Sequence, residues 1–369
     1  MALLRHSDAG LTPRHKVSDL IDEPGRPPPP VVAHVVSTVQ LRGIPTCSVR
    51  RVCQAVTHRV PLLTAWSQSS SVLHVRILHA VTHYDLLTGS GLYVYELARV
   101  MAGRGHEVSV LAENVGGELT ARTRDCGVEV FHVTAAPNRH IDVIHVHQSD
   151  PGMACLKRWP NAAAVATVHS PWPGDAPIVS DRIQMYACVR PEIRTKVIRV
   201  DGVPRGRTSV VFNGIDRTRF KPRSNGTSPA PTRDRPLVLF AATMSPMRRP
   251  AVVDLLRRSE VEGFDILLVG LGEPDYLGHL PPNARWERRE VWDIENHVSW
   301  CDQVAGTFVG RTTIEGWMCG KPAWVYDIVP FRGIRSVAVY PPPPPALLDL
   351  CDIEYMADVF HTIYAAAIG

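Results

Sequence analysis

The feature that most constrains this chain is a repeated alternation of short apolar runs with glycine-containing loops and helical segments. Runs of strand length occupy residues 75–81 and 107–113. Between them lie a loop containing Gly89 and Gly91 and a segment, 92–106, in which the apolar residues follow a helical period. Parallel strands joined in this way need a crossover connection, which is usually a helix. The pattern therefore predicts an α/β fold built on mainly parallel sheets.

The same alternation continues along the chain in two sets. The first set includes strand-like runs at residues 128–134, 142–148, 164–170 and 209–212. A second set begins with strands at 236–242 and 264–270, a basic helix at 248–259, and a closing helix at 352–367. Each set has the character of a Rossmann-like unit.

The length of 369 residues predicts two domains. We expect residues 1–72 to be a disordered extension or sequence translated from too early a start, because they are rich in proline and arginine without a sustained period. We expect an N-terminal domain at 73–222, a linker at 223–235 and a C-terminal domain at 236–369. Two such Rossmann-like domains would face each other across a cleft at the carboxyl ends of their strands.

The composition is that of an ordinary globular protein, with 45% hydrophobic and 21% charged residues. A formal net charge of +4 is too small to indicate a nucleic-acid partner. The eight cysteines form no C-x-x-C pair, so we expect reduced thiols and no metal site. No apolar run is long enough to span a membrane or to form the core of a signal peptide, and we expect a cytoplasmic protein.

The segment 309–327 has the strongest local signal. Thr312 and Glu315 have the spacing of a capping box, which predicts a helix beginning at Thr313, and Gly320 is placed to end it before a strand at 323–326. A helix start beside a carboxylate suits a phosphorylated ligand that also carries hydroxyl groups. The alternative, that Glu315 only caps its own helix, stays open on this pattern alone.

Six motifs in this order make the chain resemble the retaining GT-B glycosyltransferases of family GT4, the group 1 glycosyltransferases. They lie between residues 76 and 368 and read RILHAV with GSG, RGHEVSVL, DVIHVH, TVHS, VVFNGIDRTRF and GRTTIEGWMCGKPAWVYD. The resemblance implies a hexosyl- or glycosyltransferase of the EC 2.4 type. Such an enzyme moves a sugar from a nucleoside-diphosphate sugar to an acceptor hydroxyl with retained anomeric configuration, without a metal and with no cofactor besides the nucleotide-sugar co-substrate.

In the first domain, the resemblance places Gly89 and Gly91 near the donor diphosphate and the acceptor, and assigns His169 to catalysis beside the donor sugar. His145 and His147 are interpreted as facing opposite sides of their strand, so that they would not form a close metal pair; whether His147 lines the cleft stays open.

In the second domain, the resemblance places Arg249 on a basic position that stabilises the departing diphosphate, with Arg248 as a second donor contact. Thr243 and Thr307 stand where the family has a further basic residue and its first carboxylate, which leaves sugar selection and catalytic strength open. Glu315 matches the carboxylate that binds the ribose. The remaining donor-binding positions are Gly310, Arg311, Thr312, Thr313 and Ile314.

Two other functions are weighed against this one. A decayed glycosyltransferase scaffold that serves as a binding or regulatory protein would explain Thr243 and Thr307. A nicotinamide-dependent dehydrogenase would use Gly89, Gly91 and Glu113, but Val94 replaces the third glycine of the dinucleotide fingerprint. The acceptor, whether glycan, lipid or small molecule, is not encoded in a recognisable motif, and a peripheral membrane contact stays open.

Overall fold

The structure is a computed structural model, and it describes residues 74–136, 138–171, 177–222, 233–273, 275, 277–329 and 333–369. The predicted extension, 1–72, and residues 223–232 of the predicted linker lie outside the described residues.

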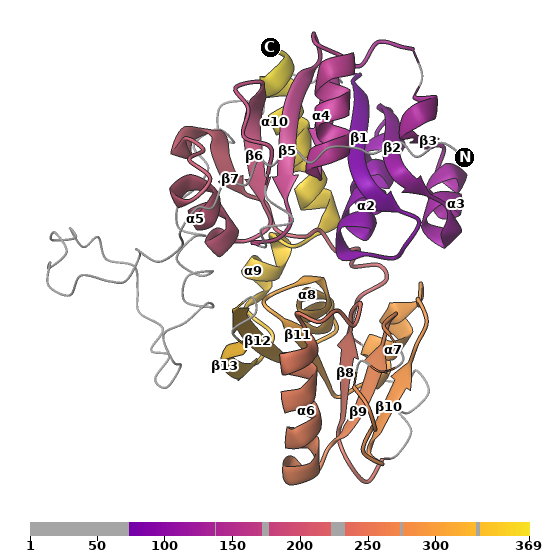
Figure 1. The fold of residues 1–369 in the computed structure, drawn as a ribbon, viewed down its shortest axis with the longest axis vertical. Coiled ribbons are helices and arrows are strands. Elements are labelled where there is room, and N and C mark those ends of the chain that lie inside the picture. The colour runs from indigo at the N-terminus through magenta and orange to yellow at the C-terminus, as the bar shows by residue number, and fades with distance from the viewer. Residues whose placement is uncertain are drawn as a thin grey trace, which may run out of the picture. The chain divides into compact units, whose positions relative to one another are not determined.

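The first sheet contains seven strands, all parallel, in the order β3-β2-β1-β4-β5-β6-β7 (Figure 1). The strand order reverses between β1 and β4, which is the point where open α/β sheets bind their ligands. The strands are β1 (Arg76–Tyr84), β2 (Glu107–Val115), β3 (Glu129–His132), β4 (Val143–Val146), β5 (Ala163–Val168), β6 (Ile183–Cys188) and β7 (Thr208–Val210). The helices in this part of the chain are α2 (Gly89–Gly103), α3 (Gly117–Asp125), α4 (Ser149–Arg158) and α5 (Pro191–Arg199).

The second sheet has six strands in the order β10-β9-β8-β11-β12-β13, and its order reverses between β8 and β11. Only its edge strand β13 is antiparallel to its neighbour. The strands are β8 (Leu237–Ala241), β9 (Asp265–Val269), β10 (Ala284–Glu287), β11 (Gln303–Thr307), β12 (Ala323–Val329) and β13 (Gly333–Tyr340). The helices are α6 (Arg249–Glu262), α7 (Ile294–Trp300), α8 (Arg311–Met318), α9 (Pro345–Asp349) and α10 (Ile353–Ile368).

The predicted α/β class with two mainly parallel sheets is confirmed. The sequence pattern missed β6 in the first sheet and both edge strands of the second sheet, β10 and β13. No residue of β10 or β13 is fully buried, and these two strands lack the continuous apolar run that marks a buried parallel strand.

The predicted loop around Gly89 and Gly91 is wrong, because both glycines lie in the first turn of α2. Thr88 is the N-cap of this helix, and its Oγ1 accepts a hydrogen bond from the Gly91 N–H at 3.0 Å. The helix therefore begins directly after β1 and its short loop, close to the carboxyl edge of the first sheet.

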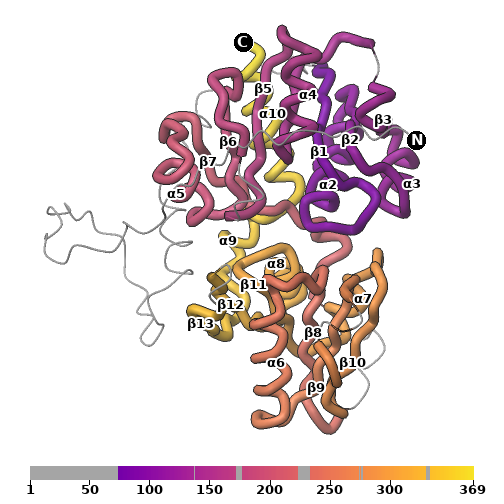
Figure 2. The backbone as a smooth tube through the Cα atoms, viewed as in Figure 1, coloured from indigo at the N-terminus to yellow at the C-terminus, as the bar shows by residue number. Residues whose placement is uncertain are grey.

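The closing helix α10 packs on the first sheet, although the sequence-based range of the second domain, 236–369, includes it (Figure 2). Its buried residues recur at helical spacing and join the core of the first sheet: Ile353, Met356, Ala357, Phe360 and Tyr364. The chain thus returns to its first sheet after completing its second.

No helix among the described residues is both long enough and apolar enough to cross a membrane.

Replacing Phe360 by alanine should lower the free energy of unfolding by about 3–5 kcal/mol, because the ring is fully buried and its removal leaves a cavity. The measurement is chemical denaturation. Ile368→Ala is the matched control in the same helix, since Ile368 is 44% exposed, and should change stability by less than about 0.5 kcal/mol. Equal losses in the two variants would contradict the docking of α10.

Candidate active site

A cavity of about 480 Å³ opens where the strands of both sheets have their carboxyl ends. From the first sheet it is lined by His147 after β4, His169 after β5 and Arg190 after β6. From the second sheet it is lined by residues that follow β8, β9, β10 and β11. This is the edge at which parallel α/β sheets place their functional side chains.

The structure brings most of the predicted site residues to this cavity. Those that line it are Gly89, His169, Arg248, Gly310, Arg311, Thr312, Thr313 and Glu315. Thr243 and Thr307, which replace the expected basic and acidic residues, line it as well.

Three predicted residues do not line the cavity. The Gly91 amide is used in capping α2. Arg249 is exposed on the first turn of α6, next to Arg248, which faces the cavity. Ile314 is 1% exposed in the hydrophobic core, and its N–H donates to the Gly310 carbonyl at 3.2 Å. Its amide is therefore not free for a ligand, contrary to the sequence-based expectation.

The predicted capping box at Thr312 and Glu315 is wrong. Helix α8 begins at Arg311 with Gly310 as its N-cap, and no side chain caps it. The Thr312 hydroxyl instead donates to the Ala241 carbonyl at 3.0 Å, which ties the start of α8 to the end of β8. The first amides of α8 are thus left for a ligand or for solvent.

Glu315 belongs to a buried ion network instead of a cap. Arg311 contacts Glu96 of helix α2 through both terminal nitrogens, at 2.7 Å and 3.3 Å, and its Nε lies 2.7 Å from Glu315 Oε1. Both carboxylates are almost fully buried, with side chains 1% and 3% exposed. Sequence reasoning missed Glu96, although a lone carboxylate on the apolar face of a helix is a usable signal.

The charges of this network influence one another strongly. Burial raises the pKa of Glu315, and the attraction of Arg311 opposes that rise. Burial by itself would lower the pKa of Arg311, but the attraction of Glu96 and Glu315 raises it above its usual value. Arg311 is therefore a permanent cation that links α2 to α8.

Arg190 and Phe308 form a second feature that the sequence did not reveal. The Arg190 guanidinium lies 4.7 Å from the centre of the Phe308 ring and pairs with Glu192 at 2.6 Å. Burial lowers the pKa of Arg190. Phe308 has a φ of +62°, in the left-handed region that non-glycine residues rarely adopt, and it lines the cavity. A usable signal for Arg190 is its place two residues after the apolar stretch that ends at Cys188.

Arginines outnumber carboxylates among the residues that line the cavity, although Arg190 pairs with Glu192, and Arg311 with Glu96 and Glu315. The ionisable lining residues of the cavity other than histidine are four arginines and two glutamates: Arg190, Arg248, Arg289, Arg311, Glu290 and Glu315. Arginine side chains suit the oxygens of phosphate groups, so the cavity is suited to an anionic ligand.

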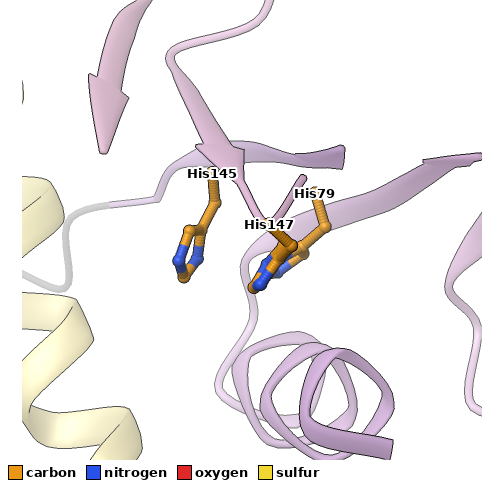
Figure 3. Close-up of side chains that lie close together, drawn as sticks. All are labelled: His79, His145 and His147. Carbon is orange, nitrogen blue, oxygen red and sulfur yellow. The ribbon is translucent and has the colours of Figure 1, made fainter. Parts of the chain in front are cut away.

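The interpretation that His145 and His147 face opposite ways is wrong. Residues separated by two positions in a strand point to the same face, and Figure 3 shows both rings on one side of the sheet beside His79. The rings of His145 and His147 are 4.2 Å apart, and His145 is the register partner of His79 on β1. One ligand atom from each of these three rings lies within 4.8 Å of the others.

Each ring nitrogen of His79, His145 and His147 has a hydrogen-bond partner, with one exception. His145 contacts the Tyr364 hydroxyl through Nδ1 and the Thr167 hydroxyl through Nε2, each at 2.7 Å. His147 lies between His79 and His169, with nitrogen–nitrogen distances of 3.0 Å on either side. The exception is His79 Nε2, which is buried and has no partner.

The four histidines are neutral at pH 7. Burial lowers the pKa of His79 and of His169 to about 3. Burial, with the nearby imidazoles, also lowers the pKa of His145 and of His147 well below the usual value.

The chain is similar to known glycosyltransferases in sequence. Residues 87–219 match the family model of Glycosyltransferase Family 4. A D-inositol 3-phosphate glycosyltransferase of Kineococcus radiotolerans is 26% identical, and the match covers 64% of this chain and 69% of that protein. A protein of the same name from Frankia alni is also 26% identical, with 53% of this chain and 62% of that protein covered.

Solved structures show the same fold. Anabaena Alr3699/HepE in complex with UDP-glucose has a TM-score of 0.56 at 18% identity, covering 80% of this chain and 92% of that one. Sucrose-phosphate synthase from Thermosynechococcus elongatus has a TM-score of 0.56 at 15% identity, covering 79% of this chain and all of that one. These likenesses confirm the predicted GT-B fold.

The neutral histidines make stability fall in acid. The unfolded chain binds protons at histidine below a pKa of about 6.5, whereas the folded chain does not until much lower pH, so the free energy of unfolding decreases as pH falls below about 6.5. Each such histidine should contribute about 1.4 kcal/mol per pH unit until its folded pKa is reached. Denaturation midpoints measured between pH 7 and 5 check this, and His79→Gln should reduce the slope. The exposed His140 serves as control, and a His140→Gln slope reduced as much as that of His79→Gln would refute the assignment.

Proposed function

We propose that this chain is a glycosyltransferase of family 4 that transfers a sugar from a nucleoside-diphosphate sugar to an acceptor hydroxyl with retention of anomeric configuration. The observation that supports this best is the arginine-lined cavity at the carboxyl ends of both sheets, into which the uncapped start of α8 opens.

In this proposal the donor diphosphate lies against the start of α8 and the arginines around it. The first amides of α8 and the positive end of its dipole favour phosphate oxygens. Arg248 and Arg190 add charge from the second and the first sheet, respectively. Stabilising the departing diphosphate is the main electrostatic task of the reaction, and these groups supply it.

We assign the ribose hydroxyls to Glu315. This carboxylate pairs with Arg311 through Oε1, and a carboxylate has two oxygens that accept hydrogen bonds. Because Glu96 also holds Arg311, Glu315 keeps a fixed orientation before the donor arrives.

His169 lies at the sugar end of the proposed site, and no side-chain nucleophile is required of the protein. A leaving-group oxygen of the diphosphate then helps to remove the proton of the acceptor hydroxyl, so that bond formation and bond cleavage take place on the same face of the sugar. Closure of the cavity around both substrates would exclude water, with which transfer competes.

The names of the relatives point to an acceptor to test first. D-inositol 3-phosphate carries hydroxyl groups beside a phosphate, and the excess of arginine in the cavity favours an anionic acceptor as well as an anionic donor.

The test combines a panel of UDP, GDP, ADP and dTDP sugars with D-inositol 3-phosphate and neutral polyols as acceptors. Release of nucleoside diphosphate that depends on the acceptor, with a product whose anomeric configuration matches the donor by NMR, is the expected result. Inverted product would refute retention. Binding of a nucleotide sugar without transfer or hydrolysis would favour a decayed scaffold instead.

Neighbouring arginines at the start of α6 give a matched pair of variants. Arg248→Ala should lower kcat by about 100-fold to 1,000-fold, because a positioned donor to the developing charge is lost. Arg249→Ala should change kcat little, since this side chain is exposed and does not line the cavity. Steady-state kinetics with the best nucleotide-sugar donor measures kcat for both variants. A larger loss of kcat in Arg249→Ala than in Arg248→Ala would support Arg249, the residue that the sequence favoured.

A further inference from the structure

Three imidazoles form a continuous hydrogen-bonded row from the core to the cavity. His79 Nδ1 lies 3.0 Å from His147 Nε2, and His147 Nδ1 lies 3.0 Å from His169 Nε2. His79 is fully buried, whereas His147 and His169 line the cavity. The row therefore begins in a closed environment and ends at the proposed sugar site.

Each ring in this row is neutral and carries one N–H and one lone pair. Every contact between two rings needs an N–H on one side and a lone pair on the other. Only two arrangements meet this condition along the whole row. Either all three rings carry their proton on Nδ1, or all three carry it on Nε2.

The buried end of the row distinguishes the two arrangements. His79 Nε2 is buried and has no hydrogen-bond partner among the described residues. The second arrangement would place an N–H there with nothing to accept it, whereas the first leaves a lone pair. Buried N–H groups without a partner are rarer in proteins than buried acceptors without one.

We infer that His79 and His147 are positioning residues that hold His169 as the tautomer with its proton on Nδ1, so that His169 presents an N–H donor to the cavity. His147 donates through Nδ1–H to His169 Nε2, and His79 fixes the proton of His147 in the same way. Within the described part of the chain, His169 Nδ1 makes no hydrogen bond of its own. An N–H group at this position can donate a hydrogen bond to an oxygen atom of the nucleotide sugar or of the acceptor hydroxyl.

The neighbouring His145 provides a control within the same cluster. It shares its strand and face with His147 but directs its two nitrogens to the hydroxyls of Tyr364 and Thr167. These bonds keep His145 outside the row. They also mean that a metal ion bound by His79, His145 and His147 would have to displace a hydroxyl partner of His145.

The role of the His169 N–H group at the sugar rests on the proposed function, but the assignment of its tautomer does not. The experiment is therefore long-range proton–nitrogen NMR on unliganded protein labelled with ¹⁵N-histidine, with the His169 signals identified by their loss in His169→Gln. We expect His169 with protonated Nδ1 and unprotonated Nε2. His169 with a protonated Nε2 in the unmodified protein would overturn the inference.

Variants test the positioning role. His147→Leu should remove the donor to His169 Nε2, so that signals of the Nε2-protonated form appear, while His145→Gln should leave the His169 signals unchanged. A His169 tautomer unaffected in His147→Leu, or altered equally in His145→Gln, would overturn the role assigned to His147. Because no turnover is measured, a failure of transfer activity and a failure of this inference are distinguishable.

Discussion

The buried contact of Arg311 with Glu96 and Glu315 is the interaction on which the site depends. It joins helix α2, which follows the first strand of the first sheet, to helix α8, which follows the fourth strand of the second. Removing one partner from a buried network of this kind leaves an uncompensated charge, which costs about 3–5 kcal/mol. The start of α8, Glu315 and the first turn of α2 are therefore held as one arrangement around the cavity.

This network lies close to a position at which the chain departs from the pattern of the family that it resembles. Thr307 stands where the family carries its first carboxylate, yet two other carboxylates, from Glu96 and Glu315, surround Arg311. The carboxylates come from two helices that lie far apart in the sequence, and Arg219 adds a second positive charge 3.7 Å from Glu96. A count of motif positions along one segment does not detect such an arrangement.

A cluster of buried, neutral histidines lies on one face of the first sheet. His79, His145 and His147 share one face because parallel strands in register align their side chains, and the helix α10 covers that face with Phe360 and Tyr364. The cost of burying these polar rings is reduced by hydrogen bonds to hydroxyls and to one another. The row of His79, His147 and His169 runs from the core to the cavity, so the orientation of His169 depends on how the core is packed.

The sequence by itself determined the α/β class, most of the strands that carry the site and a group of the residues that line the cavity, because strand and helix periods and the loops at strand ends are local properties. Only the tertiary structure decided that Thr312 bonds Ala241 instead of capping its helix, that Arg248 faces the cavity while Arg249 does not, and that α10 packs on the first sheet. It also revealed Glu96, Arg190 and the histidine row. These depend on side chains from separate elements meeting in space, and the free energy of burying and pairing such groups is set by neighbours that no local pattern specifies.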